Sequence, residues 1–247
     1  MRPYVLSIAG FDPSSGAGIT SDVKTFEALQ VYGLSVCTAL TIQTDRTFLN
    51  VNWLEADQII DQLAPLLETF PIAYCKIGLI KNWETLSEVI DYLKHTHSGI
   101  QLILDPILKA SAGFDFEHEQ LGNYTSKILK RLALLTPNYH EALQITQEHD
   151  AEYACAWLSK HCPTLLKGGH HPDELGHDYL YQQEAVHVFK PTHDDVSEKH
   201  GSGCVLSAAI TAYLALGNDL ISACSKAKAY TTNFLASNST LLGYHSV

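Results

Sequence analysis

Short, almost continuously apolar segments alternate along this chain with segments whose apolar residues recur at helical spacing. The apolar runs predict buried strands at residues 4–9, 34–42, 72–80, 100–104, 133–135 and 164–166. The helical spacing predicts helices from residue 19 toward Gly33 and at 56–70, 83–93, 124–131, 139–146, 151–160, 203–216 and 219–236. Residues 178–181 and 185–189 are typical of a hairpin. This alternation indicates an α/β fold, a three-layer sandwich with a mainly parallel central sheet and helices on both faces.

Length and composition favour one domain over residues 1–247, because a chain of 247 residues can bury a single large core. The net charge is −11 without any run of Lys or Arg, so we expect neither nucleic acid nor a membrane surface as partner. No apolar run reaches the roughly 18 residues of a membrane helix, and the N-terminal run is too short for a signal peptide. Six cysteines without a C-x-x-C pair indicate free thiols and therefore a cytoplasmic location.

Polar residues and glycines gather where the predicted strands end. They are Asp12, Gln43, Gly78, Asp105, Asn138 and Lys167. Because ligands of open α/β sheets bind at the carboxyl ends of the strands, this pattern predicts a catalytic site at that edge. Neither a Walker A motif nor a G-x-G-x-x-G after the first strand is present, so the common phosphate and dinucleotide fingerprints are absent.

The most distinctive stretch is residues 200–204, His-Gly-Ser-Gly-Cys, followed at once by an apolar helical segment. A glycine turn that opens a helix directs several backbone N–H groups, and the positive end of the helix dipole, at one spot. Such a spot holds an anion, most often a phosphate. Cys204 lies in the first turn of this helix, where we expect a lowered thiol pKa. The alternative is an ordinary loop-to-helix junction with a small buried cysteine.

Three further strand ends admit two interpretations each. The carboxylate of Asp105 suits Mg²⁺, directly or through water, or it caps the next element. Asn138 and Glu141 lie three apart on one helical face and suit a hydrated Mg²⁺, but they also match a capping box. Lys167, followed by two glycines, either meets a phosphate or is a solvated surface residue.

Six motifs together resemble the hydroxymethylpyrimidine/phosphomethylpyrimidine kinase family of the thiamine pathway. The segment Gly10-Phe11-Asp12-Pro13-Ser14-Ser15-Gly16-Ala17-Gly18 resembles that family's G-x-D-P-S-G-G-A-G loop. The others follow in the family's order: Lys76-Ile77-Gly78, Leu104-Asp105-Pro106, Thr136-Pro137-Asn138-x-x-Glu141, Leu166-Lys167-Gly168-Gly169-His170 and His200-Gly201-Ser202-Gly203-Cys204. The resemblance covers residues 4–235, nearly the whole chain.

The resemblance implies a ribokinase-like fold and an ATP- and Mg²⁺-dependent kinase that phosphorylates hydroxymethylpyrimidine and then its monophosphate, with a homodimer as the expected assembly. It implies a catalytic anion hole formed by Gly201, Ser202 and Gly203, with Cys204 where many ribokinase-like enzymes carry an Asp base. The substrate-binding residues it implies are Gly10, Asp12, Ala17, Gly18, Gln43, Ile80 and Ile107. For the nucleotide it implies Asn138, Lys167 and Gly168, and for the metal Asp105 and Glu141.

The chain departs from the family pattern in three places. Ser202 replaces a Thr, Gln43-Thr44-Asp45 replaces Gln-Asn-Thr, and the sequence stops soon after Gly243. The second departure bears on substrate choice, because pyridoxal kinases share the fold and the anion hole. Two alternatives therefore stand beside the pyrimidine kinase: a pyridoxal/pyridoxine kinase of the same superfamily, and a non-catalytic sensor that binds the pyrimidine.

Overall fold

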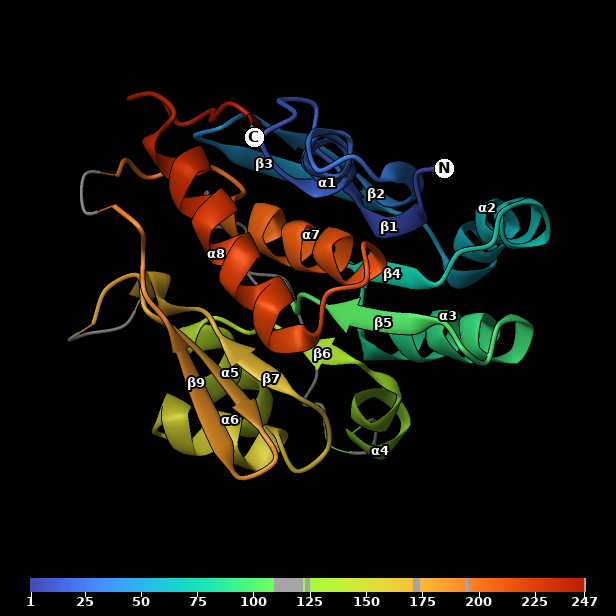
Figure 1. The fold of residues 1–247 in the computed structure, drawn as a ribbon. Coiled ribbons are helices and arrows are strands. Elements are labelled where there is room, and N and C mark those ends of the chain that lie inside the picture. The colour runs from blue at the N-terminus through green and yellow to red at the C-terminus, as the bar shows by residue number, and fades with distance from the viewer. Residues whose placement is uncertain (109–121, 123–124, 171–173, 194–195, 247) are drawn as a thin grey trace.

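Over residues 1–108, 122, 125–170, 174–193 and 196–246, the computed structural model of this protein describes a nine-stranded sheet covered by helices on both faces (Figure 1). The strand order is β3-β2-β1-β4-β5-β6-β7-β8-β9. The strands that pair in parallel are β1 (Tyr4–Phe11), β2 (Tyr32–Gln43), β4 (Tyr74–Ile77), β5 (Gln101–Leu104), β6 (Leu134–Leu135) and β7 (Thr164–Leu166). The prediction of a mainly parallel central sheet between two helical layers is confirmed.

Antiparallel strands complete both edges of the sheet. On one edge, β8 (Asp178–Gln182) and β9 (Ala185–Phe189) form the predicted hairpin and extend the sheet from β7. On the other edge, β3 (Phe48–Trp53) pairs with β2, and this strand was not predicted. Asn50 and Asn52 interrupt its apolar residues, and an edge strand that is largely exposed does not need the continuous apolar run of a buried one.

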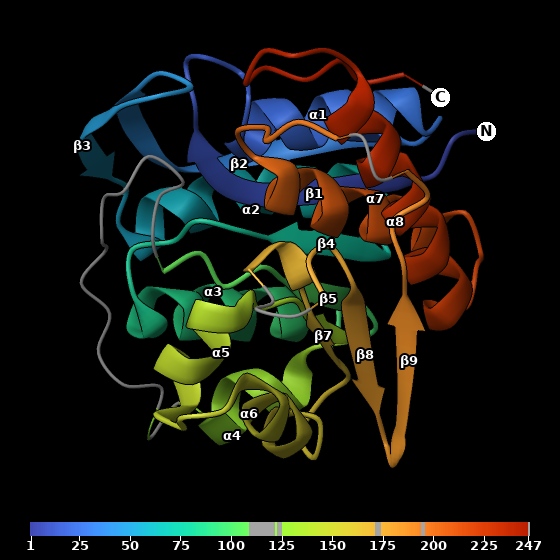
Figure 2. The same ribbon diagram turned by 90° about the vertical axis from the view of Figure 1, so that its left-hand side faces the viewer.

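The helices divide between the two faces, as Figures 1 and 2 show from two sides. The core on one face includes residues of α2 (Ala56–Thr69), α3 (Trp83–Thr96), α4 (Thr125–Ile128) and the short 3₁₀ helix η2 (Leu129–Arg131). The core on the other includes residues of α1 (Gly18–Ala28), α7 (Ser202–Ala215) and α8 (Leu220–Ala236). A smaller cluster joins β7 and β8 to α5 (Tyr139–Thr146) and α6 (Ala151–Leu158). The described helices are all too short or too polar to span a lipid bilayer.

A buried ion pair joins β4 to α1, which covers one face of the sheet. The Lys76 Nζ lies 2.7 Å from both carboxylate oxygens of Asp22, and both side chains are fully buried. The Ser7 hydroxyl on β1 donates a 2.6 Å hydrogen bond to the same carboxylate. Burial opposes the charged amine, but the attraction of Asp22 outweighs it and raises the pKa of Lys76. A full positive charge therefore lies in the interior, held by two strands and a helix.

Replacing Lys76 by Met should cost about 3–5 kcal/mol of unfolding free energy, because the Asp22 carboxylate would be left buried without its partner. Urea denaturation monitored by circular dichroism measures this loss. The matched control is Lys81→Met, which removes the ion pair between Lys81 and Glu55, whose side chains are 34% and 62% exposed. That control should cost less than about 1 kcal/mol. If both variants lost the same unfolding free energy, the buried pair of Lys76 and Asp22 would not have the stabilising role assigned to it.

Candidate active site

Most of the predicted site residues meet at the carboxyl edge of the parallel strands. Figure 2 views the molecule from the side toward which β5 points in Figure 1, with the start of α7 facing the reader. Three segments converge there: the loop of residues 12–18 between β1 and α1 (the Asp12 loop), residues 200–204 before and within α7 (the glycine turn), and the strand ends at Asp105 and Lys167. The expected edge is therefore the one that brings the motifs together.

The glycine turn is built on a backbone conformation that requires glycine. Gly201, the N-cap of α7, has φ 76°, in the left-handed region. A Cβ on Gly201 would lie 2.1 Å from the Gly16 carbonyl oxygen, so no side chain fits between this turn and the Asp12 loop. No side chain of the described residues caps α7, so its first amides remain for a ligand. A Cβ on Gly203 would lie 3.4 Å from the Lys167 Nζ, which places that ammonium beside the turn.

Cys204 occupies the predicted place in the first turn of α7, but the expected lowering of its pKa is wrong. The residue is only 6% exposed, and burial raises the pKa of its thiol to about 11. The charge of Lys76 and a backbone hydrogen bond from Gly18 act in the opposite direction without overcoming burial. The resting side chain is thus a neutral thiol, and a helix N-terminus alone does not make it a thiolate.

Iodoacetamide should therefore modify Cys204 slowly at neutral pH, with a rate that rises about tenfold per pH unit toward the pKa because only the thiolate reacts. Mass spectrometry of digested protein reports the modified site. The half-buried Cys37 is the internal control and should react before Cys204. Preferential modification of Cys204 at neutral pH would instead indicate an activated thiol.

Lys167 lies between two carboxylates rather than in solvent. Its Nζ is 2.5 Å from the Asp105 Oδ1 and 3.5 Å from the Glu141 Oε2, and its side chain is 11% exposed. Burial opposes its charge, but Asp105 and Glu141 outweigh burial and raise the pKa of Lys167. The surface-residue alternative for Lys167 is wrong. The other oxygen of Asp105 accepts a 3.1 Å hydrogen bond from the Ser207 hydroxyl on α7, so one carboxylate joins the strand end to that helix.

Asn138 and Glu141 form the capping box that their spacing allowed. The Asn138 side chain accepts from the Glu141 N–H at 2.9 Å, and the Glu141 carboxylate accepts from the Asn138 N–H at 2.7 Å. Burial raises the pKa of Glu141 to about 7, although the nearby Lys167 lowers it. A structural role for Glu141 at the start of α5 is therefore established, whichever other role it has.

The two predicted metal ligands, Asp105 and Glu141, lie on either side of the Lys167 ammonium. In the part of the chain that the structure describes, no cluster of three or more His, Cys, Asp or Glu side chains is placed to hold an ion. Asp105 and Glu141 each already contact Lys167. Because Mg²⁺ keeps several water ligands and takes others from substrate phosphates, two carboxylates suit an ion held through water. The metal roles of Asp105 and Glu141 remain predictions on these terms.

Within the Asp12 loop, Asp12 organises the backbone. Its carboxylate is 1% exposed and accepts hydrogen bonds from the N–H groups of Ser14, Gly16 and Ala17 at 2.8, 3.1 and 2.8 Å. Gly18 has φ 61°, and a Cβ there would lie 2.1 Å from the Gly10 carbonyl oxygen. These contacts favour a binding role in which Asp12 shapes the loop and the backbone faces a ligand.

The remaining predicted residues lie in different surroundings. Ile107 packs with Ala39 in a small cluster beside Gly10. Gln43 ends β2 on the arm that β2 and β3 form, where it is partly exposed. Ile80 is 6% exposed within the core formed by α2 and α3. The Gly168 N–H donates to the Asp178 carboxylate at 2.8 Å and is therefore already engaged.

Sequence reasoning missed His200 as a site residue. Its imidazole Nε2 lies 3.0 Å from the Asp12 Oδ2, which joins two motifs that are 188 residues apart. The position of His200 directly before the glycine turn could have suggested a role in the site. The neighbouring sequence, however, does not indicate that Asp12 is its partner.

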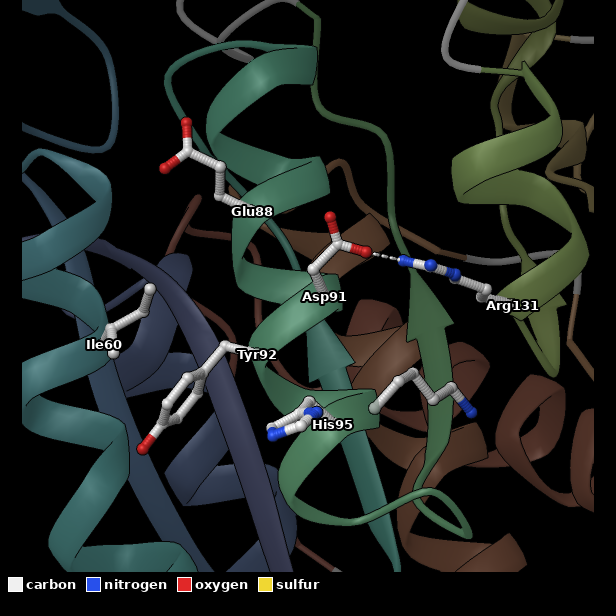
Figure 3. A pocket seen from close by; sticks show the side chains of 7 residues that line it. Ile60, Glu88, Asp91, Tyr92, His95 and Arg131 are labelled. Atoms are coloured by element: carbon white, nitrogen blue, oxygen red, sulfur yellow. Dashed lines mark hydrogen bonds and ion pairs between the residues drawn. The ribbon is translucent and has the colours of Figure 1, made fainter.

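A surface pocket of about 720 Å³ lies elsewhere, between α2, α3 and η2 (Figure 3). Figure 3 shows Glu88, Asp91 and His95 along α3, with Arg131 reaching Asp91 from the neighbouring segment. None of the predicted site residues lines this pocket. Since it contacts neither the Asp12 loop nor the glycine turn, it is not part of the candidate active site.

Comparison with known proteins points to one family. A family model described as phosphomethylpyrimidine kinase matches residues 12–246. A relative from Escherichia coli (strain K12), named hydroxymethylpyrimidine/phosphomethylpyrimidine kinase, is 32% identical over an alignment 255 residues long, gaps included, that covers 100% of this chain and 96% of the relative.

Solved structures agree with this similarity. Phosphomethylpyrimidine kinase from Clostridium difficile 630 superposes with a TM-score of 0.78 at 31% identity, covering 94% of this chain and 99% of that one. Pyridoxal kinase from Staphylococcus aureus, in complex with AMP-PCP and pyridoxal, has a TM-score of 0.84 at 25% identity, covering 98% of this chain and 90% of that one.

Proposed function

This chain belongs to the phosphomethylpyrimidine kinase family, and we propose that the site at its sheet edge performs that family's reaction through the residues gathered there. The protein is a ribokinase-like kinase of the thiamine pathway. It transfers the ATP γ-phosphoryl group to the hydroxymethyl oxygen of hydroxymethylpyrimidine and then a second one to the resulting monophosphate.

The observation that carries the proposal for the site is the position of Lys167 beside an uncapped helix start. Among the residues that the structure describes, no side chain caps the first amides of α7, and the Lys167 ammonium lies next to Gly203. Phosphoryl transfer depends mainly on positioning and on stabilising charge that spreads over the phosphoryl oxygens. We assign Gly201, Ser202 and Gly203 to the anion hole and Lys167 to the nucleotide phosphates. Asn138 and Gly168 flank the same nucleotide side of the site.

Cys204 is assigned to the attacking hydroxyl group. As the alcohol oxygen bonds to phosphorus and the bond to the ADP oxygen breaks, the hydroxyl proton must leave. Because burial raises the pKa of Cys204 to about 11, only the small thiolate fraction can take this proton and become the neutral thiol, and otherwise the proton passes to a phosphoryl oxygen or to water. Cys204 therefore has a minor role as base. The loose transition state of this reaction makes little demand on a base. The anion hole therefore contributes more than the thiol.

ATP as co-substrate fits the bound nucleotide analogue of the Staphylococcus aureus relative. Magnesium would supply positive charge to offset the charge of the nucleotide phosphates, because a protein of net charge −11 has few cationic side chains for this purpose. We place Asp105 and Glu141 near that ion through water. The proposal also includes a homodimer, testable by light scattering, and a cytoplasmic location, which six free cysteines support.

The pyrimidine is assigned to the space between the Asp12 loop and the arm that carries Gln43, with Gly10, Ala17, Gly18 and Ile107 beside it and Ile80 behind. The structural similarity to a pyridoxal-bound kinase makes pyridoxal the second candidate substrate. ATP consumption should be measured with hydroxymethylpyrimidine, its monophosphate and pyridoxal. Turnover of the first two supports the proposal, turnover of pyridoxal alone supports the second candidate, and binding without turnover supports a sensor.

Glu141→Gln should weaken the Mg²⁺ dependence and lower kcat while leaving the fold intact, because the amide oxygen still accepts from the Asn138 N–H but carries no charge. Titration of activity with Mg²⁺, beside a thermal melt, measures both effects. Glu84→Gln is the control, since Glu84 is an exposed carboxylate in the first turn of α3. A lower Tm with unchanged kinetics would leave Glu141 with its capping role only.

Gln43→Leu should raise KM for hydroxymethylpyrimidine by at least about tenfold and leave KM for ATP within about twofold. An amide offers one donor and one acceptor to the edge of an aminopyrimidine, and leucine offers neither. Initial rates at varied concentrations of each substrate give both constants. Gln101→Leu, at the start of β5 and thus at the opposite end of the sheet, is the control. Equal changes in both KM values would remove Gln43 from the pyrimidine site.

A further inference from the structure

The glycine turn and the Asp12 loop contact each other through their backbones. A Cβ on Gly201 would lie 2.1 Å from the Gly16 carbonyl oxygen and 2.8 Å from the Ala17 Cα. No side chain therefore lies between the two backbones at this contact. Any shift of the Asp12 loop is transmitted directly to the turn, because packed backbone has little room to deform.

A single carboxylate oxygen connects the two segments chemically. The Asp12 Oδ2 accepts from the N–H groups of Gly16 and Ala17, at 3.1 and 2.8 Å, and also lies 3.0 Å from the His200 Nε2. His200 directly precedes Gly201 and is 5% exposed. Since the carboxylate can only accept here, the Nε2 carries the proton and donates. Burial and attraction to one charged group make this a strong bond.

The backbone and ring of His200 are fixed from other sides as well. Its N–H donates to the Leu241 carbonyl oxygen at 2.9 Å, which ties it to the segment after α8. A Cβ on Gly16 would lie 2.6 Å from the His200 Cδ2, so the ring packs against the Asp12 loop. No group of the described residues hydrogen-bonds to the Nδ1 of this ring. Among the described residues, Asp12 is thus the single hydrogen-bond partner of the ring.

We propose that His200 is a positioning residue, which holds the Asp12 loop and the glycine turn in register through the bond from its Nε2 to Asp12. The inference rests on the proposed function, in which the first segment binds the pyrimidine and the second forms the anion hole. The bond aligns the hydroxymethyl oxygen with the phosphoryl group that it attacks. Small misplacements of reacting groups cost large factors in rate, so the register of these two segments governs catalysis.

Three substitutions at position 200 distinguish the effect of losing the hydrogen bond to Asp12 from the effect of losing the volume of the imidazole ring. His200→Gln can place an N–H donor close to the position of the Nε2, whereas His200→Asn is too short and His200→Leu has no donor. The Asn and Leu variants should raise KM for hydroxymethylpyrimidine about tenfold and lower kcat about tenfold, with KM for ATP within about twofold. The Gln variant should stay within about threefold of the wild type. If His200 were merely structural, its loss would not raise KM for hydroxymethylpyrimidine while leaving KM for ATP unchanged, and Gln would not restore the wild-type constants.

Lys199→Met is the matched control. The Lys199 Nζ donates to the Asn238 carbonyl oxygen at 2.5 Å, so this variant also loses a bond to the C-terminal segment but none to the Asp12 loop. It should lower Tm and leave both KM values unchanged. Wild-type protein that turns over none of the pyrimidine substrates would overturn the proposed function. The role of His200 would be overturned if the wild type is active but the Leu variant differs from it only in Tm. It would also be overturned if the Gln and Leu variants have the same kinetic constants.

Hydrogen exchange provides a readout that does not depend on activity or on the folding of the Leu variant. In the wild type and in His200→Gln, added hydroxymethylpyrimidine should protect the amides of residues 14–17 and 201–204 together. Protection of the Asp12 loop without the glycine turn would contradict the coupling.

Discussion

The pairing of buried lysines with buried carboxylates is the interaction on which the rest of this structure depends. Lys76 is held by Asp22, and Lys167 by Asp105, each at 2.7 Å or less. An unpaired charge in either place would be prohibitively costly, whereas a paired one keeps its charge in the interior. Because Lys76 is paired with Asp22, and Lys167 contacts both Asp105 and Glu141, these lysines stay charged without adding net positive charge to this edge of the sheet. The same pairs hold β4, α1 and the strand ends in place.

Burial decides the protonation of two other groups at this edge. It raises the pKa of Cys204 to about 11 and that of Glu141 to about 7. A neutral thiol is compatible with the proposed reaction, in which amides and cations would stabilise the transition state more than a base would. Glu141 combines a capping bond with a position beside Lys167, so local structure and electrostatics at the start of α5 depend on one side chain.

Two glycine-rich segments from opposite ends of the chain form one unit. The turn before α7 and the loop after β1 touch through backbone atoms, and the bond from His200 to Asp12 closes the same contact. Both ligands of the proposed reaction, the pyrimidine and the phosphoryl group, would then be bound by parts that move together. Glycine is required at Gly18 and Gly201 by both the sign of φ and the closeness of the neighbouring carbonyl oxygen.

The sequence by itself determined most of the alternation of strands and helices, the edge of the sheet where the motifs meet, and the family, because apolar periodicity and ordered motifs are local signals. It missed β3, whose polar alternation resembles a loop, left open whether Lys167 is a solvated surface residue, and wrongly expected a lowered thiol pKa for Cys204. Only the tertiary structure decided which charges are buried together, that His200 faces Asp12, and that burial outweighs the helix dipole at Cys204. These properties depend on partners that are tens to hundreds of residues away, and desolvation is set by everything packed around a group rather than by its neighbours in the chain.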